Sequence, residues 1–482
     1  MTGRSPTAAA RRPHQGWTLA LTSLGVFMTA LDTLVVTTAL PVLRVDLHAS
    51  LSDLEWTVNA YNLAFACLLL TGAALGDRFG RRRMFAIGLF LFSAASAAAA
   101  LSPSVSALIA ARAVQGGGAA IVMPLTLTLI SEAFPIERRG AAIGIWGGIS
   151  GLAVAAGPVV GGAVVDGIGW HWIFWLNVPI GLALIPLAAT KLTESFGPRP
   201  QLDVVGLGLA AAGFFGLTWG LVRANDVGWG SVEVIAGLVS GAALVVAFLG
   251  WERRARSPML PLALFRARGF ATANAISFFL YGGLFGAVFL MSQYFQTALG
   301  YSPLNAGLRL LPWTATPMLI APVAGKLADR YGNRPFMIVG LALQAIGLAW
   351  VALIASPDIG YLELGVALTI AGVGTSMTFP TVANAVVGSV PLSEAGVASG
   401  TNSAMRELGG VFGVAVLAAV FARHGGYSTP QVFVDGFGPA LWVAVALSAL
   451  GVFAAVLAPR RARPGVAAAV DQRALAFAGE AD

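Results

Sequence analysis

Four charged side chains interrupt segments of this 482-residue chain that are otherwise apolar: Asp32, Arg112, Arg406 and Glu407. A charge at the centre of a membrane helix costs about 2.5–3.5 kcal/mol, so each is expected to face the protein interior and a partner. For Arg112, snorkelling to the surface is the alternative. A carboxylate held in this way can exchange protons. The hypothesis is that Asp32 alternates between a proton and a bound molecule beside Arg112, with Arg406 and Glu407 as a second candidate pair for proton coupling.

The segments that must position these charges are expected to be membrane helices. Of all residues, 57% are hydrophobic and 11% are charged, whereas soluble domains average about 25% charged. Apolar runs of about 20 residues predict spanning helices, and the short alternating segments of a membrane β-barrel are absent. The single cysteine, Cys67, excludes an intrachain disulfide and a thiolate metal site.

Fourteen apolar runs follow one another along the chain. They lie at about 17–40, 54–75, 84–101, 105–130, 141–165, 172–192, 204–221, 232–251, 270–299, 306–327, 336–354, 362–387, 396–422 and 437–458. We therefore expect an N-terminal six-helix bundle at 17–192, an inserted helix pair with its loops at 193–268, and a C-terminal six-helix bundle at 269–458. The segments 1–16 and 459–482 are expected to be tails.

The distribution of Lys and Arg predicts the orientation. Of the 29 basic residues, 23 fall on the side of the tails and 4 on the other side, while Arg112 and Arg406 lie inside spans. Basic residues accumulate in cytoplasmic loops, so both termini are expected in the cytoplasm. This placement also explains the net charge of +7 without a nucleic-acid partner.

A short loop motif occurs twice. Ala73-Ala-Leu-Gly-Asp77-Arg78-Phe-Gly80-Arg81-Arg is similar to Gly325-Lys-Leu-Ala-Asp329-Arg330-Tyr-Gly332-Asn-Arg, and each copy follows the second run of its six-helix group. Here the chain resembles the major facilitator superfamily, whose loop signature is Gly-x-Leu-Ala-Asp-Arg-x-Gly-Arg-Lys. The resemblance implies a conformational latch at Asp77, Arg78, Gly80, Arg81, Asp329, Arg330 and Gly332; a plain arginine-rich turn is the alternative. Ala73 and Asn333 depart from the signature.

Three further motifs narrow the resemblance. Arg112-Ala-Val-Gln115-Gly matches the superfamily's fourth-span signature, and Gly157-Pro158-Val-Val-Gly161-Gly162 matches its antiporter motif. A generic kinked packing face is the alternative reading of the second one. Leu31-Asp32-Thr-Leu-Val-Val-Thr-Thr-Ala-Leu-Pro41 is similar to the signature of fourteen-helix drug:proton antiporters. Leu34 and Thr37 replace a threonine and an asparagine of that signature, so substrate choice is expected to differ.

The resemblance implies an all-α polytopic membrane protein with the major facilitator fold, in a bacterial plasma membrane. It implies a proton-coupled antiporter that exports small organic compounds by alternating access, working as a monomer with substrate, protons and lipid as partners and without cofactor or metal. Uptake by proton symport and a membrane-embedded lipid-modifying enzyme are the alternatives. Cavity contacts are expected from polar or aromatic residues on the helices that border the cavity in this family: Tyr61, Asn62, Gln115, Tyr281, Gln293, Tyr294 and Asn402.

Overall fold

The computed structural model describes residues 15–197, 203–256, 258, 260, 262–390 and 395–459, and these residues form helices and loops without a strand. The expected tails, 1–16 and 459–482, lie outside the described residues except at their inner edges. The helices are α1 (Gln15–Asp46), α2 (Leu51–Phe79), α3 (Arg81–Ala100), α4 (Val105–Ala133), α5 (Ile136–Gly167), α6 (His171–Trp175), α7 (Asn177–Lys191), α8 (Val204–Val227), α9 (Val232–Glu252), η1 (Leu262–Arg266), α10 (Arg268–Gln293), η2 (Tyr294–Ala298), α11 (Pro303–Thr314), α12 (Thr316–Tyr331), α13 (Asn333–Ile354), α14 (Tyr361–Val387), α15 (Ala395–His424) and α16 (Pro430–Leu457).

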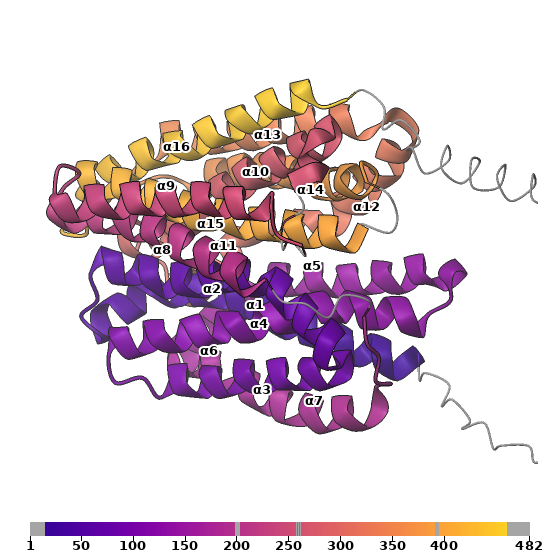
Figure 1. The fold of residues 1–482 in the computed structure, drawn as a ribbon. Coiled ribbons are helices and arrows are strands. Elements are labelled where there is room, and N and C mark those ends of the chain that lie inside the picture. Colours follow the sequence, from indigo (N-terminus) through magenta and orange to yellow (C-terminus); the bar gives the residue numbers. More distant parts are fainter. Residues whose placement is uncertain are drawn as a thin grey trace, which may run out of the picture.

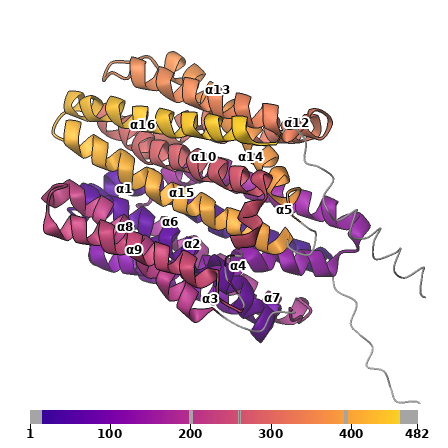
Figure 2. The same cartoon turned by 45° about the horizontal axis from the view of Figure 1, so that its top comes forward.

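The helices gather into two bundles and a separate pair. Helices α1 to α7 pack on one another through the α2–α4, α3–α4, α1–α5 and α3–α7 contacts, and α10 to α16 form the second bundle. The two bundles meet where α5 packs on α11 and where α2 packs on α15. The α8–α9 hairpin lies against α2 and α15, beside the seam between the bundles (Figures 1 and 2).

The repeated loop motif builds the same turn in both bundles. Gly80 ends α2 and Gly332 ends α12, and the two glycines have φ angles of 102° and 86°. Residues with a side chain seldom adopt positive φ, whereas glycine does so at little cost. The next helix, α3 or α13, begins directly after each glycine, so the motif joins two antiparallel helices with a one-residue turn.

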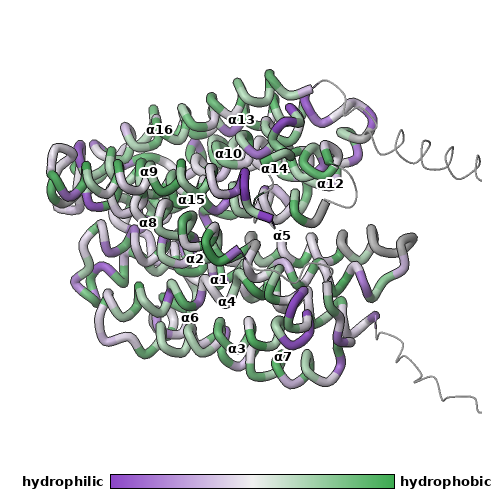
Figure 3. The backbone as a smooth tube through the Cα atoms, viewed as in Figure 1, coloured by the Kyte–Doolittle hydropathy of each residue, from purple (hydrophilic) through white to green (hydrophobic). Residues whose placement is uncertain are grey.

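The described residues contain twelve helices long and apolar enough to cross a membrane, and thirteen if the two parts of α2, bent by 51°, count as one span. Figure 3 shows apolar residues along the length of these helices, with polar residues more frequent near the ends. Helices α11 and α12 have 12 and 16 residues, and each is shorter than the roughly 20 residues that a bilayer requires.

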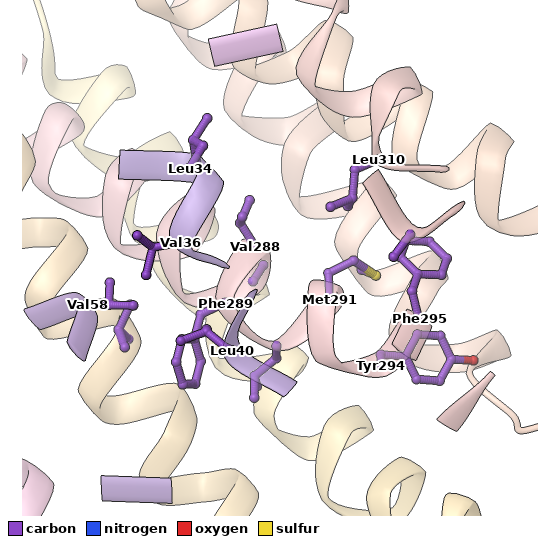
Figure 4. Packing of buried hydrophobic residues seen from close by; sticks show 14 of the residues in the cluster. Leu34, Val36, Leu40, Val58, Val288, Phe289, Met291, Tyr294, Phe295 and Leu310 are labelled. Carbon is purple, nitrogen blue, oxygen red and sulfur yellow. The ribbon is translucent and has the colours of Figure 1, made fainter. Parts of the chain in front are cut away.

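We call the end of the molecule where α1 begins and α16 ends the terminal end, and the opposite end the far end (Figure 1). A large apolar core lies toward the far end and contains residues of both bundles. Figure 4 shows Leu34 and Leu40 of α1 close to Val288 and Phe289 of α10. The bundles are therefore joined by apolar packing near the far end.

Candidate central cavity and buried charged cluster

A cavity of about 180 Å³ lies between the two bundles. Its walls come from α1, α2, α4 and α5 of the first bundle and from α10, α11, α12, α14 and α15 of the second. Most lining side chains are apolar, aromatic or small and polar, among them Thr29, Thr33, Leu34, Phe65, Leu284, Phe285, Trp313, Thr375 and Phe379. Such a surface can hold an organic molecule through shape and apolar contact, with a few polar groups to orient it.

Two charged residues, Arg406 and Glu407 of α15, line this cavity. Arg406 donates hydrogen bonds to the Tyr281 hydroxyl (3.2 Å) and to Ser403 Oγ (3.1 Å), and its guanidinium carbon lies 5.2 Å from the Tyr281 ring. Among the described residues, no side chain donates a hydrogen bond to the Glu407 carboxylate. Glu407 is thus an acid in the cavity wall whose oxygens are free to meet a proton, water or a ligand.

Aromatic rings form much of the wall on both sides. Tyr61 and Phe65 are stacked on α2 with centroids 6.2 Å apart. Across the cavity, the Tyr281 ring lies 5.6 Å from Phe285 and 5.4 Å from Phe379. Rigid aromatic faces on opposite walls suit a flat or amphiphilic organic molecule.

Asp32 does not line the cavity but lies behind its wall in a buried cluster. Its Oδ2 accepts from Arg112 Nη1 at 2.5 Å, and its Oδ1 accepts from Gln115 Nε2 and Asn177 Nδ2 at 2.8 Å each. The side chains of Asp32 and Arg112 are each 1% exposed. We call Asp32, Arg112, Gln115, Asn177 and Ser96 the charged cluster; it joins α1, α3, α4 and α7.

Arg112 makes two further hydrogen bonds in the same region. Nη1 also donates to Gln115 Oε1 (2.8 Å), and Nε donates to the Thr57 carbonyl (3.2 Å). Ser96 Oγ receives hydrogen bonds from Gln115 and Asn177 and donates to the Phe174 carbonyl. The charged pair is therefore neutralised and well supplied with hydrogen bonds, as a buried ion pair must be to persist.

Tyr61 connects the charged cluster with the cavity. Its ring lines the cavity on one face, while the guanidinium carbon of Arg112 lies 4.3 Å from the ring centroid. A cation over a ring face is attracted to the electrons of the ring. A molecule that displaces Tyr61 would therefore act on Arg112 and Asp32 without touching them.

The structure divides the seven expected cavity residues. Tyr61 and Tyr281 line the cavity. Gln115 belongs instead to the charged cluster, and Asn402 donates to Asn274 Oδ1 and Ser277 Oγ within the second bundle. The others lie elsewhere: Tyr294 donates to the Ser356 carbonyl, Gln293 accepts from Tyr427, and Asn62 is buried in α2. These five side chains do not line the cavity in this conformation, and their role in substrate binding stays a prediction.

Several residues of the site were not expected from the sequence. Ser96 lies in an alanine-rich helix and Asn177 at the start of α7, and neither had a charged neighbour in the sequence to indicate its role. Thr29 and Thr33 of α1 line the cavity. Their spacing of four residues places them on one helix face, and that spacing is the signal that could have identified them.

In the first motif copy, the expected latch residues contact the first bundle and the loop after α7. Arg81 donates to Asp77 at 2.7 Å and also pairs with Glu132. The Gly197 amide donates to the Asp77 carbonyl (3.0 Å), and the Arg81 amide donates to the Ser195 carbonyl (2.9 Å).

The arginine directly after the aspartate of each motif copy lies at the surface. Arg78 and Arg330 are exposed, each near the aromatic residue that follows it. The side chain of Asp329 lies outside the described residues. Within the part of the chain that the structure describes, the Asp77 carboxylate pairs with Arg81 of its own bundle.

The glycines of the antiporter motif let α5 approach two helices closely. A Cβ at Gly157 would lie 2.7 Å from Leu34 Cβ, and one at Gly161 would meet Thr38 and Val35, so both face α1. A Cβ at Gly162 would lie 2.7 Å from Leu304 Cα of α11, across the seam. Pro158 lies within α5 beside Gly307 of α11. These residues thus form the packing surface of α5 toward both bundles.

The same helix shows that the bundles are together at the far end and apart at the terminal end. Gly162 near the far end contacts α11, whereas a Cβ at Gly147, Gly148 or Gly151 would meet no described atom within 4 Å. Figure 1 shows α5 and α12 diverging toward the terminal end.

A polar contact also closes the far end. The Arg44 guanidinium carbon of α1 lies 3.8 Å from the ring of Tyr427, in the loop before α16. Tyr427 donates to Gln293 Oε1 at 2.5 Å, and Gln296 donates to the Thr38 carbonyl at 2.9 Å. Burial raises the pKa of the Tyr427 phenol, so it stays protonated and can donate.

Comparison with known proteins agrees with this architecture. The sequence profile of the Major Facilitator Superfamily matches residues 22–414 and, in a second match, 273–478. The chain is 36% identical over 441 residues to the tetracenomycin C resistance and export protein of Streptomyces glaucescens, covering 89% of this chain and 81% of that protein. It is 34% identical over 426 residues to the drug efflux pump JefA of Mycobacterium tuberculosis, covering 88% and 84%. A crystal structure of the peptide transporter POT shares the fold, with a TM-score of 0.68 at 17% identity over 93% of this chain and 95% of that one.

Proposed function

This chain belongs to the major facilitator superfamily, among relatives of its drug efflux pumps, and from that membership we propose that it exports small organic compounds from the cytoplasm in exchange for protons. It is a multi-pass membrane transporter and not an enzyme. The observation that carries the proposal is the cavity between the bundles, with aromatic walls and the carboxylate of Glu407 in its lining.

We propose fourteen spans with both termini in the cytoplasm. Helices α11 and α12 are separated only by Ala315 and together cover 303–331, which is long enough for one span. Counted as one span, α11 and α12 bring the total to fourteen, together with the twelve single helices and the bent α2. The 23 basic residues on the side of the tails, against 4 on the other, favour a cytoplasmic terminal end. The units are then the bundles 17–192 and 269–458, with the inserted pair 193–268 between them.

With this orientation the cavity opens toward the cytoplasm, and the conformation is inward-open. Substrate enters between α5 and α12 at the terminal end, where the bundles are apart. Separation of the bundles at the far end would then release it outside. The glycines of the antiporter motif and the Arg44–Tyr427 contact are the parts that must separate or slide in that step.

We propose that Glu407 is the group for which substrate and proton compete. Its carboxylate is in the cavity, whereas the carboxylate of Asp32 already accepts three hydrogen bonds behind the wall. Asp32 therefore acts on the cavity indirectly, because it fixes Arg112 against Tyr61. In this proposal Glu407, and not Asp32 as expected from the sequence, is the acid that meets the substrate. Arg406, held against Tyr281, is proposed to set the position of the neighbouring charge.

The cavity favours an amphiphilic substrate with an aromatic or apolar body. The adjacent Arg406 and Glu407 in its lining offer both signs of charge, so a cationic or zwitterionic group is expected to bind better than an anionic one alone. Proton-driven uptake is the second candidate, but the residues of the antiporter motif match the exporter signature.

The test is substrate-induced proton release from inverted vesicles that contain a pH-sensitive dye. The wild-type protein is expected to exchange protons for substrate, and an uncoupler should abolish accumulation. Glu407→Gln should bind substrate and lose proton release, whereas Asp32→Asn should retain the ratio of protons to substrate at a lower rate. Loss of proton release in Asp32→Asn but not in Glu407→Gln would assign the coupling to Asp32. Substrate uptake into intact cells along with protons would contradict export.

A further inference from the structure

Two asparagines of α2 are buried without a hydrogen-bond partner in the described part of the chain. Asn59 is 0% exposed and Asn62 is 1% exposed. All four polar side-chain atoms, Nδ2 and Oδ1 of each residue, lack a partner among the described residues. Most buried polar side-chain atoms in native proteins are hydrogen-bonded, and a buried amide without partners is costly. Two such side chains three residues apart therefore require an explanation.

The position of these asparagines on α2 places them toward the second bundle. Residues three or four apart lie on one helix face. Leu63, four residues after Asn59, belongs to a small apolar cluster with Val411 of α15, and Phe214 of α8 packs at the edge of that cluster. Tyr61 and Phe65 occupy a different face, toward the cavity. The pair of asparagines thus lies on the side of α2 that packs on α15, across the seam between the bundles.

The seam between the bundles is closed at the far end in this conformation. It must open there in the outward-open conformation. Asn59 and Asn62 precede the middle of α2, which begins at Leu51 at the far end, and the bundles are packed together at that end. When α2 and α15 separate there, water reaches their facing side chains. The two amides then gain the hydrogen bonds that they lack in the conformation described here.

We propose that Asn59 and Asn62 are positioning residues for the export step, which shift the transporter toward its outward-open conformation because opening of the seam lets water reach their amides. An equilibrium between two conformations shifts toward the one in which the groups are better satisfied. This inference rests on the alternating access of the proposed function, but it does not depend on which acid carries the proton.

The experiment measures how often the far end is open. Cys67→Ser removes the only native cysteine, and cysteines introduced at Val45 of α1 and Leu362 of α14 carry spin labels. Both residues are exposed, at 71% and 82%, and they lie on different bundles near the far end. Distance distributions between the labels, recorded in lipid nanodiscs, give the populations of closed and open far ends.

The variant Asn59→Leu/Asn62→Leu keeps side chains of similar size without polar atoms. We expect the ratio of far-end-open to far-end-closed molecules to fall about tenfold, which is about 1.4 kcal/mol. The maximal transport rate should fall with it, while the half-saturating substrate concentration at the cytoplasmic side changes little. Asn59→Ser/Asn62→Ser retains polar groups and should recover much of the open population.

Ser93→Ala provides the matched control. Ser93 Oγ is also buried and has no partner among the residues described, but Ser93 faces Gly181 of α7 inside the first bundle. Its substitution should leave the population ratio unchanged. The inference is overturned if the double leucine variant keeps the wild-type ratio or opens more, or if Ser93→Ala shifts the ratio equally. If the populations shift as expected but no compound is exported, the proposed function fails and the inference stands.

Discussion

The two charged pairs of this transporter lie in opposite surroundings. In the first bundle, Asp32 and Arg112 bond to each other and are 1% exposed, with Gln115 and Asn177 completing the acceptors of Asp32. In the second bundle, Arg406 and Glu407 are neighbours in α15, line the cavity, and do not bond to each other within the described residues. The first arrangement favours structural stability, and the second leaves an acid available for exchange. Depth in a membrane helix is thus a poor guide to which acid lines the cavity.

The largest expected effect comes from breaking the first pair. Arg112→Ala removes the counter-charge of Asp32 and leaves a buried carboxylate with fewer donors. Removing one partner of a buried ion pair typically costs about 3–5 kcal/mol. We expect a large loss of thermal stability in detergent and poor yield in membranes. Arg406→Ala is the control from the second bundle, where the arginine is only half-buried; its stability should change much less.

The comparison would fail if Arg406→Ala destabilised the protein as strongly as Arg112→Ala. Combining Asp32→Asn with Arg112→Ala sharpens it further, since neutralising both partners should restore part of the stability lost in Arg112→Ala alone. A double variant less stable than either single variant would mean that the two side chains act mainly through other contacts.

The second expected effect concerns the acid in the cavity. One proton moving through about 100 mV supplies roughly 2.3 kcal/mol, enough for about a fifty-fold gradient of a neutral substrate. The accumulation ratio is the substrate concentration inside inverted vesicles divided by that outside. Glu407→Gln should reduce this ratio from about fifty to about one, while thermal stability stays near that of the wild-type protein. Accumulation of a fluorescent substrate in inverted vesicles measures the ratio, and Glu407→Asp is the control that keeps the carboxylate. Uphill transport at the wild-type level in Glu407→Gln would exclude this acid.

The sequence identified the charged residues and the helices but not their relation to the cavity. Asp32, Arg112 and the glycines of α5 could be identified because they stand out from an apolar background and match known motifs. Ser96 and Asn177 could not be identified in this way. They bond to each other although they lie 81 positions apart in the chain, and no local pattern indicates such a contact. Asn402 and Gln293 have the polarity of cavity residues, yet each side chain faces its own bundle.

A third prediction compares the two ends of α5. Gly162 touches α11 across the seam, whereas a Cβ at Gly148 would meet no described atom. Gly162→Val overpacks the closed far end, and overpacking typically costs about 1–3 kcal/mol. We expect the far end to open more often and transport to slow, while Gly148→Val transports almost normally. Both proteins should still reach the membrane, as measured by fluorescence of a C-terminal tag. Equal transport rates would remove the distinction between the two ends.

The smallest expected effect comes from the contact between Arg44 and Tyr427, which joins the bundles at the far end. A cation over an aromatic ring contributes about 0.5–1 kcal/mol at exposed sites, so Arg44→Gln should raise the open fraction about two- to fivefold. Arg309→Gln is the matched control: its guanidinium carbon also lies 3.8 Å from a tyrosine ring, that of Tyr301, but both residues belong to the second bundle.

The pH dependence of the Arg44 effect sharpens this last test. Burial raises the pKa of Tyr427, so its phenol remains neutral up to at least about pH 10, the ordinary tyrosine value. The Arg44–Tyr427 contact and the hydrogen bond from Tyr427 to Gln293 therefore keep the same form below that pH, since the phenol ionises only above it. The distance between spin labels at the far end should respond to Arg44→Gln by the same factor at mildly acidic and mildly alkaline pH. A factor that changes across that range, or an equal response in Arg309→Gln, would show that the far end is held closed by other groups.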